Sequence, residues 1–419
     1  MNSKNLLVRW RRNREVMKIQ PLFKGFSLSN WSKRNIVTIC AIPIVWWQLI
    51  NGWIYFGTQE GFGDFLYVLE RADCLPIPME ELYSERTENV CTGYIYGSVL
   101  LRVLNFLGLG QPALIPIGYT FFAIVGLFYL KATKNSTNIF QSLVYLSLFF
   151  SPPMILLFER ANLDSLIFIL ITTYAMLIIR KYFVAAFFLA AAASLFKFYA
   201  IPLLFITIFF SKKFFRLPLI VVSLIVSIQV FLDIDRITHL PWDARNMFGN
   251  VVWGEYLLYL VKGSQTHANF VFSTVLGLGI LGTIWWFLKK KMTVVSYWTY
   301  TGSRDQKFFI VYLSMYLICF FSGLSVDYRL VFLLFAFIYF EKTINLNPAM
   351  AILTRSCMLM TFYLSFNFEL LQPLGDLAQM VLIAILLILL EPFIRLNFVR
   401  LINEIQVVTT MIFDRASRN

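Results

Sequence analysis

The segment GFGDFLYVLERADC, residues 61–74, opens the most acidic part of an otherwise basic and apolar chain. It follows a hydrophobic run at 36–56 and belongs to a longer segment, 57–110, whose carboxylates include Glu60, Asp64, Glu70, Asp73, Glu80, Glu81, Glu85 and Glu88. A carboxylate held where a first membrane helix ends can act as a base on a substrate at the membrane surface. Asp64 is therefore the first candidate functional residue. The rest of the chain would form the surroundings of this carboxylate.

Composition indicates the fold class. The chain has 419 residues, is 59% hydrophobic and 14% charged, and contains 43 Phe. Hydrophobic runs recur along its whole length, which is typical of a polytopic membrane protein. Because lipid cannot satisfy backbone polar groups, and no segment alternates like a barrel strand, the spans should be helices. We predict an all-α fold.

About twelve transmembrane helices are expected, with both termini inside. The predicted spans are 36–56, 111–131, 139–158, 163–179, 183–196, 200–211, 217–232, 270–288, 308–323, 329–341, 348–366 and 374–391. The basic loops between them fall on one side, which the positive-inside rule makes cytoplasmic. Orientation and anionic lipid thus explain the net charge of +13 better than nucleic acid does.

The same pattern predicts the division of the chain. A basic cytoplasmic tail (1–34) precedes a single integral-membrane domain (35–395), and a cytoplasmic C-terminal tail (396–419) follows. We expect a multi-pass protein of the inner (plasma) membrane.

The first outer loop should contain amphipathic helices. Residues 64–72 place apolar side chains on one side, and residues 95–107 repeat that pattern. Cys74 and Cys91 share this loop, either as one disulfide or as two free thiols. No cluster of His and Cys indicates zinc.

Asp64 has two interpretations. As a functional group it would take a proton from a hydroxyl that attacks a substrate. As a structural group it would be a solvated loop acid or the N-cap of the helix that follows.

The charged turn at 158–164 lies between two predicted spans. Glu159 and Arg160 could pair, while Asn162 and Asp164 would begin the next helix. An ordinary turn capped by Asn162 or Asp164 is the alternative. The turn is very short, which packs these polar groups close to the bilayer edge.

Two further cations stand at the ends of predicted spans. Lys197 interrupts an apolar stretch and needs either an anionic partner or a route to water, so phosphate binding and snorkelling are both open. Arg329 can grip a phosphate with two parallel hydrogen bonds, and an ion pair with Asp327 or with another span is the alternative. With Arg160, these cations would suit a lipid-linked phosphate.

The order of these features resembles that of the GT-C type membrane glycosyltransferases, and within them glycosyltransferase family 87, the mannosyltransferase-like branch. The resemblance extends from the first predicted span to the tenth. The matching pieces are Gly63-Asp64-Phe65, Tyr94-Ile-Tyr96-Gly97, Asn162-Leu-Asp164, Lys197-Phe-Tyr199 with Pro202, and Asp327-Tyr328-Arg329.

The resemblance implies an inverting transfer of a hexose, such as mannose, from a polyprenyl-phosphate donor to a lipid or glycan acceptor at the outer membrane face. Asp64 matches the family's catalytic aspartate. The phosphate would be held by Lys197, Arg329 and Arg160, and the substrates by Tyr96, Asn162, Asp164, Tyr199 and Tyr328. Because the leaving group is already a phosphate, we expect no metal and no other cofactor.

Three alternative functions would each require other sequence features. A flippase or transporter of lipid-linked sugars would carry polar residues at the bilayer midplane and internal repeats. A Wzy-like polymerase of lipid-linked oligosaccharides would carry arginine-rich outer loops, whereas the loops here are acidic. A structural scaffold would not explain charges clustered in short turns.

Overall fold

A computed structural model describes residues 62–75, 97–134, 139–211, 213–237, 247–248, 270–291, 301–321, 325–326, 329–344, 348–364, 373–391, 394–395 and 399. The predicted first span, 36–56, and the basic N-terminal tail lie outside these residues.

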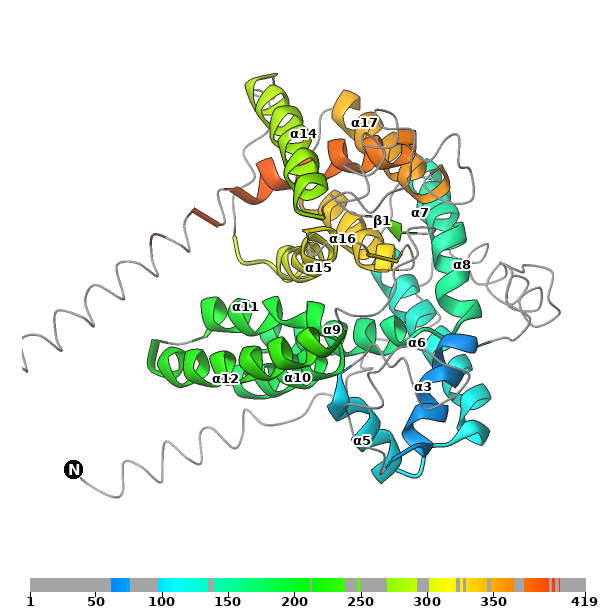
Figure 1. Cartoon of the computed structure of the whole chain (residues 1–419). Coiled ribbons are helices and arrows are strands. Elements are labelled where there is room, and N and C mark those ends of the chain that lie inside the picture. Colours follow the sequence, from blue (N-terminus) through cyan, green and yellow to red (C-terminus); the bar gives the residue numbers. More distant parts are fainter. Residues whose placement is uncertain are drawn as a thin grey trace, which may run out of the picture.

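The described part is almost entirely helical, which confirms the predicted all-α class (Figure 1). One antiparallel pair of two-residue strands, β1 (Met247–Phe248) and β2 (Ser325–Val326), accompanies the helices. The α-helices are α3 (Gly63–Asp73), α5 (Ser98–Phe106), α6 (Leu114–Thr133), α7 (Ile139–Phe149), α8 (Pro152–Glu159), α9 (Leu163–Ile179), α10 (Phe183–Phe196), α11 (Pro202–Phe210), α12 (Lys213–Ile237), α14 (Phe270–Lys291), α15 (Arg304–Phe321), α16 (Leu330–Thr343), α17 (Pro348–Tyr363) and Pro373–Glu391. Short 3-10 turns, η2 (Gln111–Ala113) and η3 (Phe198–Ala200), precede α6 and α11.

The apolar helices indicate a membrane-embedded protein. Within the described ranges, two helices are long and apolar enough to cross a bilayer, Gln111–Thr133 and Pro373–Glu391. A third span results if Phe140–Phe149 and Pro152–Glu159 are counted together. The predicted number of twelve stays a prediction.

The segment predicted as one span at 139–158 is broken in the structure. α7 and α8 are bent by 43° relative to each other. Pro152 occupies the first position of α8, where its missing N–H removes the hydrogen bond that would continue α7. The hydroxyl of buried Ser151 donates to the carbonyl of Leu148 at 2.6 Å, which satisfies one carbonyl at the break.

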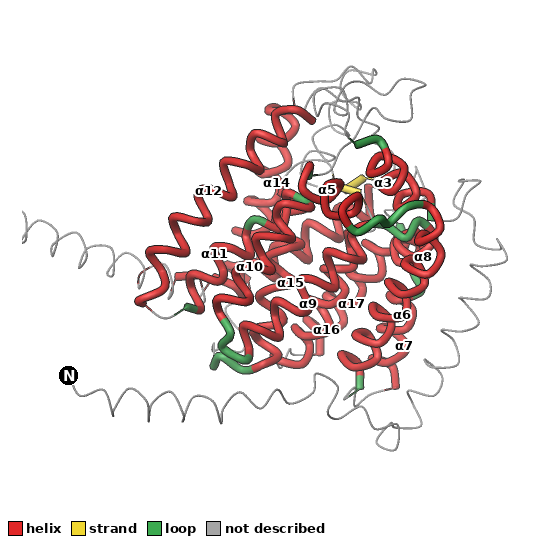
Figure 2. The backbone as a smooth tube through the Cα atoms, turned by 90° about the horizontal axis from the view of Figure 1, so that it is seen from below, coloured by secondary structure: helices red, strands yellow, loops and turns green. Residues whose placement is uncertain are grey.

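The core is made by α9, α15 and α16, which run side by side in Figure 2. Residues 330–340 of α16 are all buried, as expected of a helix that is apolar all round. Phe168 of α9 lies 4.5 Å from Phe335 of α16 and 5.6 Å from Tyr312 of α15, measured between ring centroids. In lipid, such close side-chain packing holds helices together.

The two predicted amphipathic helices are present as α3 and α5. Their apolar faces form a second cluster in which Phe65, Leu69 and Leu101 are buried, and this cluster packs against Phe121 of α6. Figure 2 shows α3 and α5 at one end of the bundle.

α5 is fixed to α10 by Gly97. The N–H of Gly97 donates to the carbonyl of Phe196 at 3.2 Å. A Cβ atom on Gly97 would lie 1.7 Å from the carbonyl oxygen of Leu195, so only glycine fits this approach.

Candidate active site

Four helix ends meet at the candidate site. Asp64 lies in the first turn of α3 and Asp164 in the first turn of α9, while Lys197 directly follows α10 and Arg329 directly precedes α16. The side-chain contacts described below place these four ends together. α9 is about 25 Å long at 1.5 Å per residue, so the basic turn at Arg180 lies at the opposite end of the bundle.

The turn between α8 and α9 has a well-defined geometry. Asn162 N–H donates to the carbonyl of Leu157 at 3.2 Å, and Ala161 N–H donates to that of Phe158 at 3.1 Å. With Ala161 in the left-handed region (φ 43°), these bonds form a Schellman motif that ends α8. Asn162 then begins α9 as its N-cap, so its backbone position is determined by both helices.

The start of α3 is attached to the same turn. Phe62 N–H donates to the carbonyl of Glu159 at 2.7 Å. This bond brings the first turn of α3, and with it Asp64, beside Arg160 and Asn162.

The Asp64 carboxylate accepts from two donors of that turn. Asn162 Nδ2 donates to Asp64 Oδ2 at 2.5 Å, and an Arg160 guanidinium nitrogen lies 3.3 Å from Asp64 Oδ1. The alternative of Asp64 as an N-cap is wrong, because α3 begins at Gly63 with Phe62 as its N-cap. The carboxylate thus faces the charged turn rather than capping its own helix.

Asn162 connects Asp64 to the rest of the site. Its Oδ1 accepts the N–H of Asp164 at 2.8 Å and lies 3.4 Å from Lys197 Nζ. These partners are donors and Asp64 is an acceptor, so together they fix the orientation of the amide. The alternative interpretation of Asn162 as a helix cap is confirmed, and the same side chain also orients Asp64.

Asp164 is the buried centre of the cation cluster. Its Oδ1 lies 2.9 Å from Lys197 Nζ and accepts from the Tyr199 hydroxyl. Its Oδ2 lies 3.5 Å from Arg329 Nε, so Arg329 forms an ion pair with a residue of another predicted span. The Arg329 guanidinium also stands 4.9 Å over the Tyr199 ring.

Burial divides the site into two layers. The side chains of Lys197 and Asp164 are 3% and 0% exposed, so Lys197 does not snorkel. The side chains of Arg160 and Asp64 are 31% and 21% exposed, and that of Arg329 is 19% exposed. Solvent therefore reaches Asp64, Arg160 and Arg329, whereas Lys197 and Asp164 are enclosed by the protein.

The formal charge of this cluster suits an anion. The five described side chains joined by these ion pairs, three cations and two carboxylates, have a net charge of +1 (3 − 2). A phosphodiester carries one negative charge, which would neutralise the cluster.

The described residues include only part of the predicted site. Tyr96, Tyr328 and Cys91 lie outside the described residues. Cys74 is disulfide-bonded, whereas neither Cys319 nor Cys357 forms a disulfide. The pairing of Cys74 with Cys91 stays a prediction. Among the described side chains, no group of three His, Cys, Asp or Glu residues could hold a metal ion.

The contacts that align the site were not predicted from the sequence. The sequence left open a pair of Glu159 with Arg160 and did not indicate that Arg160 contacts Asp64. Phe62 was not predicted either. Its role depends on its backbone N–H, so its residue type gives no indication of that role. The positive φ of Ala161 could not be predicted from the sequence either, because alanine rarely adopts a positive φ.

Comparison of the chain with protein-family models, curated proteins and solved structures finds no match.

Proposed function

We propose that this chain is a GT-C type glycosyltransferase, similar to glycosyltransferase family 87. It would transfer a hexose, such as mannose, from a polyprenyl-phosphate donor to a lipid or glycan acceptor at the outer face of the plasma membrane. One observation carries the proposal: a partly exposed carboxylate, Asp64, pairs with partly exposed Arg160 at one end of an apolar helical bundle, and Asn162 connects it to the Asp164 cluster that includes partly exposed Arg329. A base next to an anion site is what this transfer needs.

In this mechanism Asp64 takes the proton of the acceptor hydroxyl. The acceptor oxygen forms a bond to the anomeric carbon while the bond from that carbon to the phosphate oxygen breaks. The electron pair of the broken bond leaves with the polyprenyl phosphate, so the configuration inverts. Arg329 and Arg160 stabilise the negative charge that grows on the departing phosphate.

Burial assigns different roles to the cations. Arg329 and Arg160 would contact the phosphate directly because each is partly exposed. Lys197 would act through Asp164, by holding the carboxylate that orients Arg329. Arg160 would be shared between Asp64 and the phosphate, so donor binding would draw it away from the base and free the carboxylate.

A flippase for lipid-linked sugars is the competing function. It needs polar groups at mid-bilayer depth that are exposed alternately to each side. The described cluster instead lies at helix ends, which favours chemistry at one face.

The test is sugar transfer by the purified full-length chain in lipid, with a panel of polyprenyl-phosphate sugars. Asp64→Asn should keep donor binding, since it removes a charge with little change in volume, and turnover should fall roughly a hundredfold or more. Near-normal turnover of Asp64→Asn would remove Asp64 from catalysis. Sugar movement across the bilayer without transfer would favour the flippase.

A further inference from the structure

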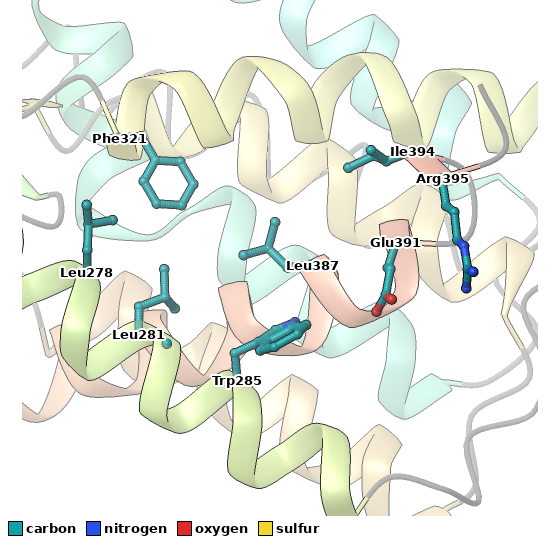
Figure 3. Close-up of a pocket in the computed structure, with 9 residues that line it drawn as sticks. Leu278, Leu281, Trp285, Phe321, Leu387, Glu391, Ile394 and Arg395 are labelled. Carbon is teal, nitrogen blue, oxygen red and sulfur yellow. The ribbon is translucent and has the colours of Figure 1, made fainter. Parts of the chain in front are cut away.

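A second candidate site lies between α14, the end of α15 and the helix Pro373–Glu391. The cavity has a volume of about 510 Å³, within the roughly 300–1,000 Å³ of pockets that hold small ligands. Figure 3 shows Leu278, Leu281 and Phe321 at one end, with Trp285 and Leu387 toward the middle. This part of the wall is apolar.

The other end of the cavity is charged. Figure 3 shows Glu391 and Arg395 there, away from Phe321. Lys289 Nζ lies 2.6 Å from Glu391 and 4.6 Å above the Trp285 ring. Arg395 is exposed, and no ion pair to it is found within the described ranges. Among the described side chains at this end, two cations against one carboxylate give a net charge of +1 (2 − 1).

The charged end is distinct from the candidate active site. α15 ends at Phe321, and the chain then reaches Arg329 of that site within a few residues. The Phe321 end of the cavity therefore lies toward the active site, and the Arg395 end lies away from it.

We infer that this cavity binds one anionic glycerophospholipid of the surrounding bilayer. An acyl chain would lie along Leu278, Leu281 and Phe321, and the phosphate would pair with Arg395. The occupant is amphiphilic because the cavity is apolar at one end and charged at the other. It is anionic because the charged end is net positive, and guanidinium groups bind phosphate with strong hydrogen bonds. Trp285 beside Lys289 gives the aromatic and basic pairing typical of a membrane interface.

Native mass spectrometry of the full-length chain in detergent tests this inference without reference to enzymatic activity. The protein is incubated with phosphatidylglycerol or with phosphatidylcholine of the same acyl chains. One phosphatidylglycerol should be retained in preference to phosphatidylcholine. Arg395→Glu should reduce retention roughly tenfold or more, the scale of a lost hydrogen bond to a charged group. Arg180→Glu, at an exposed arginine of another turn, is the matched control and should retain the lipid.

A second variant keeps the test independent of charge. Leu278 is 42% exposed, so Leu278→Trp should fold and should fill the apolar end. Loss of phosphatidylglycerol in this variant would support the inference. Equal retention of both lipids, or unchanged retention in both variants, would overturn it. Retention of undecaprenyl phosphate in place of phosphatidylglycerol would also overturn it, because the cavity would then belong to the donor.

Discussion

Asn162 is the residue through which the two carboxylates of the candidate site are aligned. Asn162 Oδ1 caps α9 and lies near Lys197, while Asn162 Nδ2 donates to Asp64. These two functions can be separated by substitution, since a hydroxyl can cap a helix but is too short to replace the amide donor.

Asn162→Ser should therefore lower turnover and leave stability nearly unchanged. A hydrogen bond to a charged group contributes about 1.5–3 kcal/mol, so turnover should fall roughly tenfold to a hundredfold with little change in KM. Asn162→Asp also caps α9 but places a carboxylate against Asp64, and should be worse than Asn162→Ser. Transfer assays and thermal melting check both variants. A serine variant with unchanged turnover would restrict Asn162 to capping.

Lys197 and Arg329 should differ in what their loss affects. Lys197→Ala removes one partner of a buried ion pair, which should destabilise the protein by about 3 kcal/mol or more. Arg329→Ala removes a partly exposed cation and should mainly weaken donor binding.

Thermal melting and donor titration separate these effects. Lys289→Ala breaks an exposed ion pair with Glu391 and should change stability by less than about 1 kcal/mol, which makes it the control. If Arg329→Ala melts as early as Lys197→Ala but binds donor normally, the proposed phosphate contact is wrong.

Among the elements, α5 depends most on a single small residue. Gly97→Ala would force a methyl group into the Leu195 carbonyl, so α5 must move away from α10. We expect a clearly lower melting temperature and reduced transfer, because α5 packs on α3 and α3 carries Asp64. Gly126→Ala is the control, since nothing lies within 4 Å of its added Cβ, and alanine favours a helix by about 0.5–1 kcal/mol. Equal melting of both variants would contradict this account of α5.

The elements could largely be predicted from the sequence. The predicted spans 163–179 and 183–196 match α9 and α10 because each apolar run ends at charged or polar turns. The break at Ser151 was not predicted, since hydrophobicity continues through it and only the missing N–H groups of Pro152 and Pro153 interrupt the hydrogen bonding.

The sequence could predict which residues belong to the candidate site, but not which of them contact each other. Charged residues are few in an apolar chain, so Asp164, Lys197 and Arg329 were evident as candidates. Which of them meet depends on helix packing, and Asp64 and Arg160 are separated by 96 positions in the sequence. Local patterns do not encode a contact of that range.

At the scale of the whole molecule, the site and the basic turns lie at opposite ends of α9. If the basic end is cytoplasmic, membrane-impermeant thiol reagents added from outside should label Asp73→Cys, which is exposed on α3. They should not label Arg304→Cys, which is exposed at the start of α15, unless the membrane is permeabilised. External labelling of Arg304→Cys in intact cells would overturn the predicted topology.

The buried ion pairs of Asp164 also bear on biogenesis. Lys197 follows Asp164 by 33 positions, so at roughly 5–20 residues per second it leaves the ribosome within about 2–7 s. If α9 and α10 are spans, as predicted, they can then enter the lipid as a helical hairpin in which the charges of Asp164 and Lys197 already compensate each other. Arg329 emerges on the order of 160 residues after Asp164, long after that hairpin is complete. Until α16 docks, Asp164 Oδ2 lacks its Arg329 partner, so the ion pairs of the site are completed only when α16 packs against the hairpin.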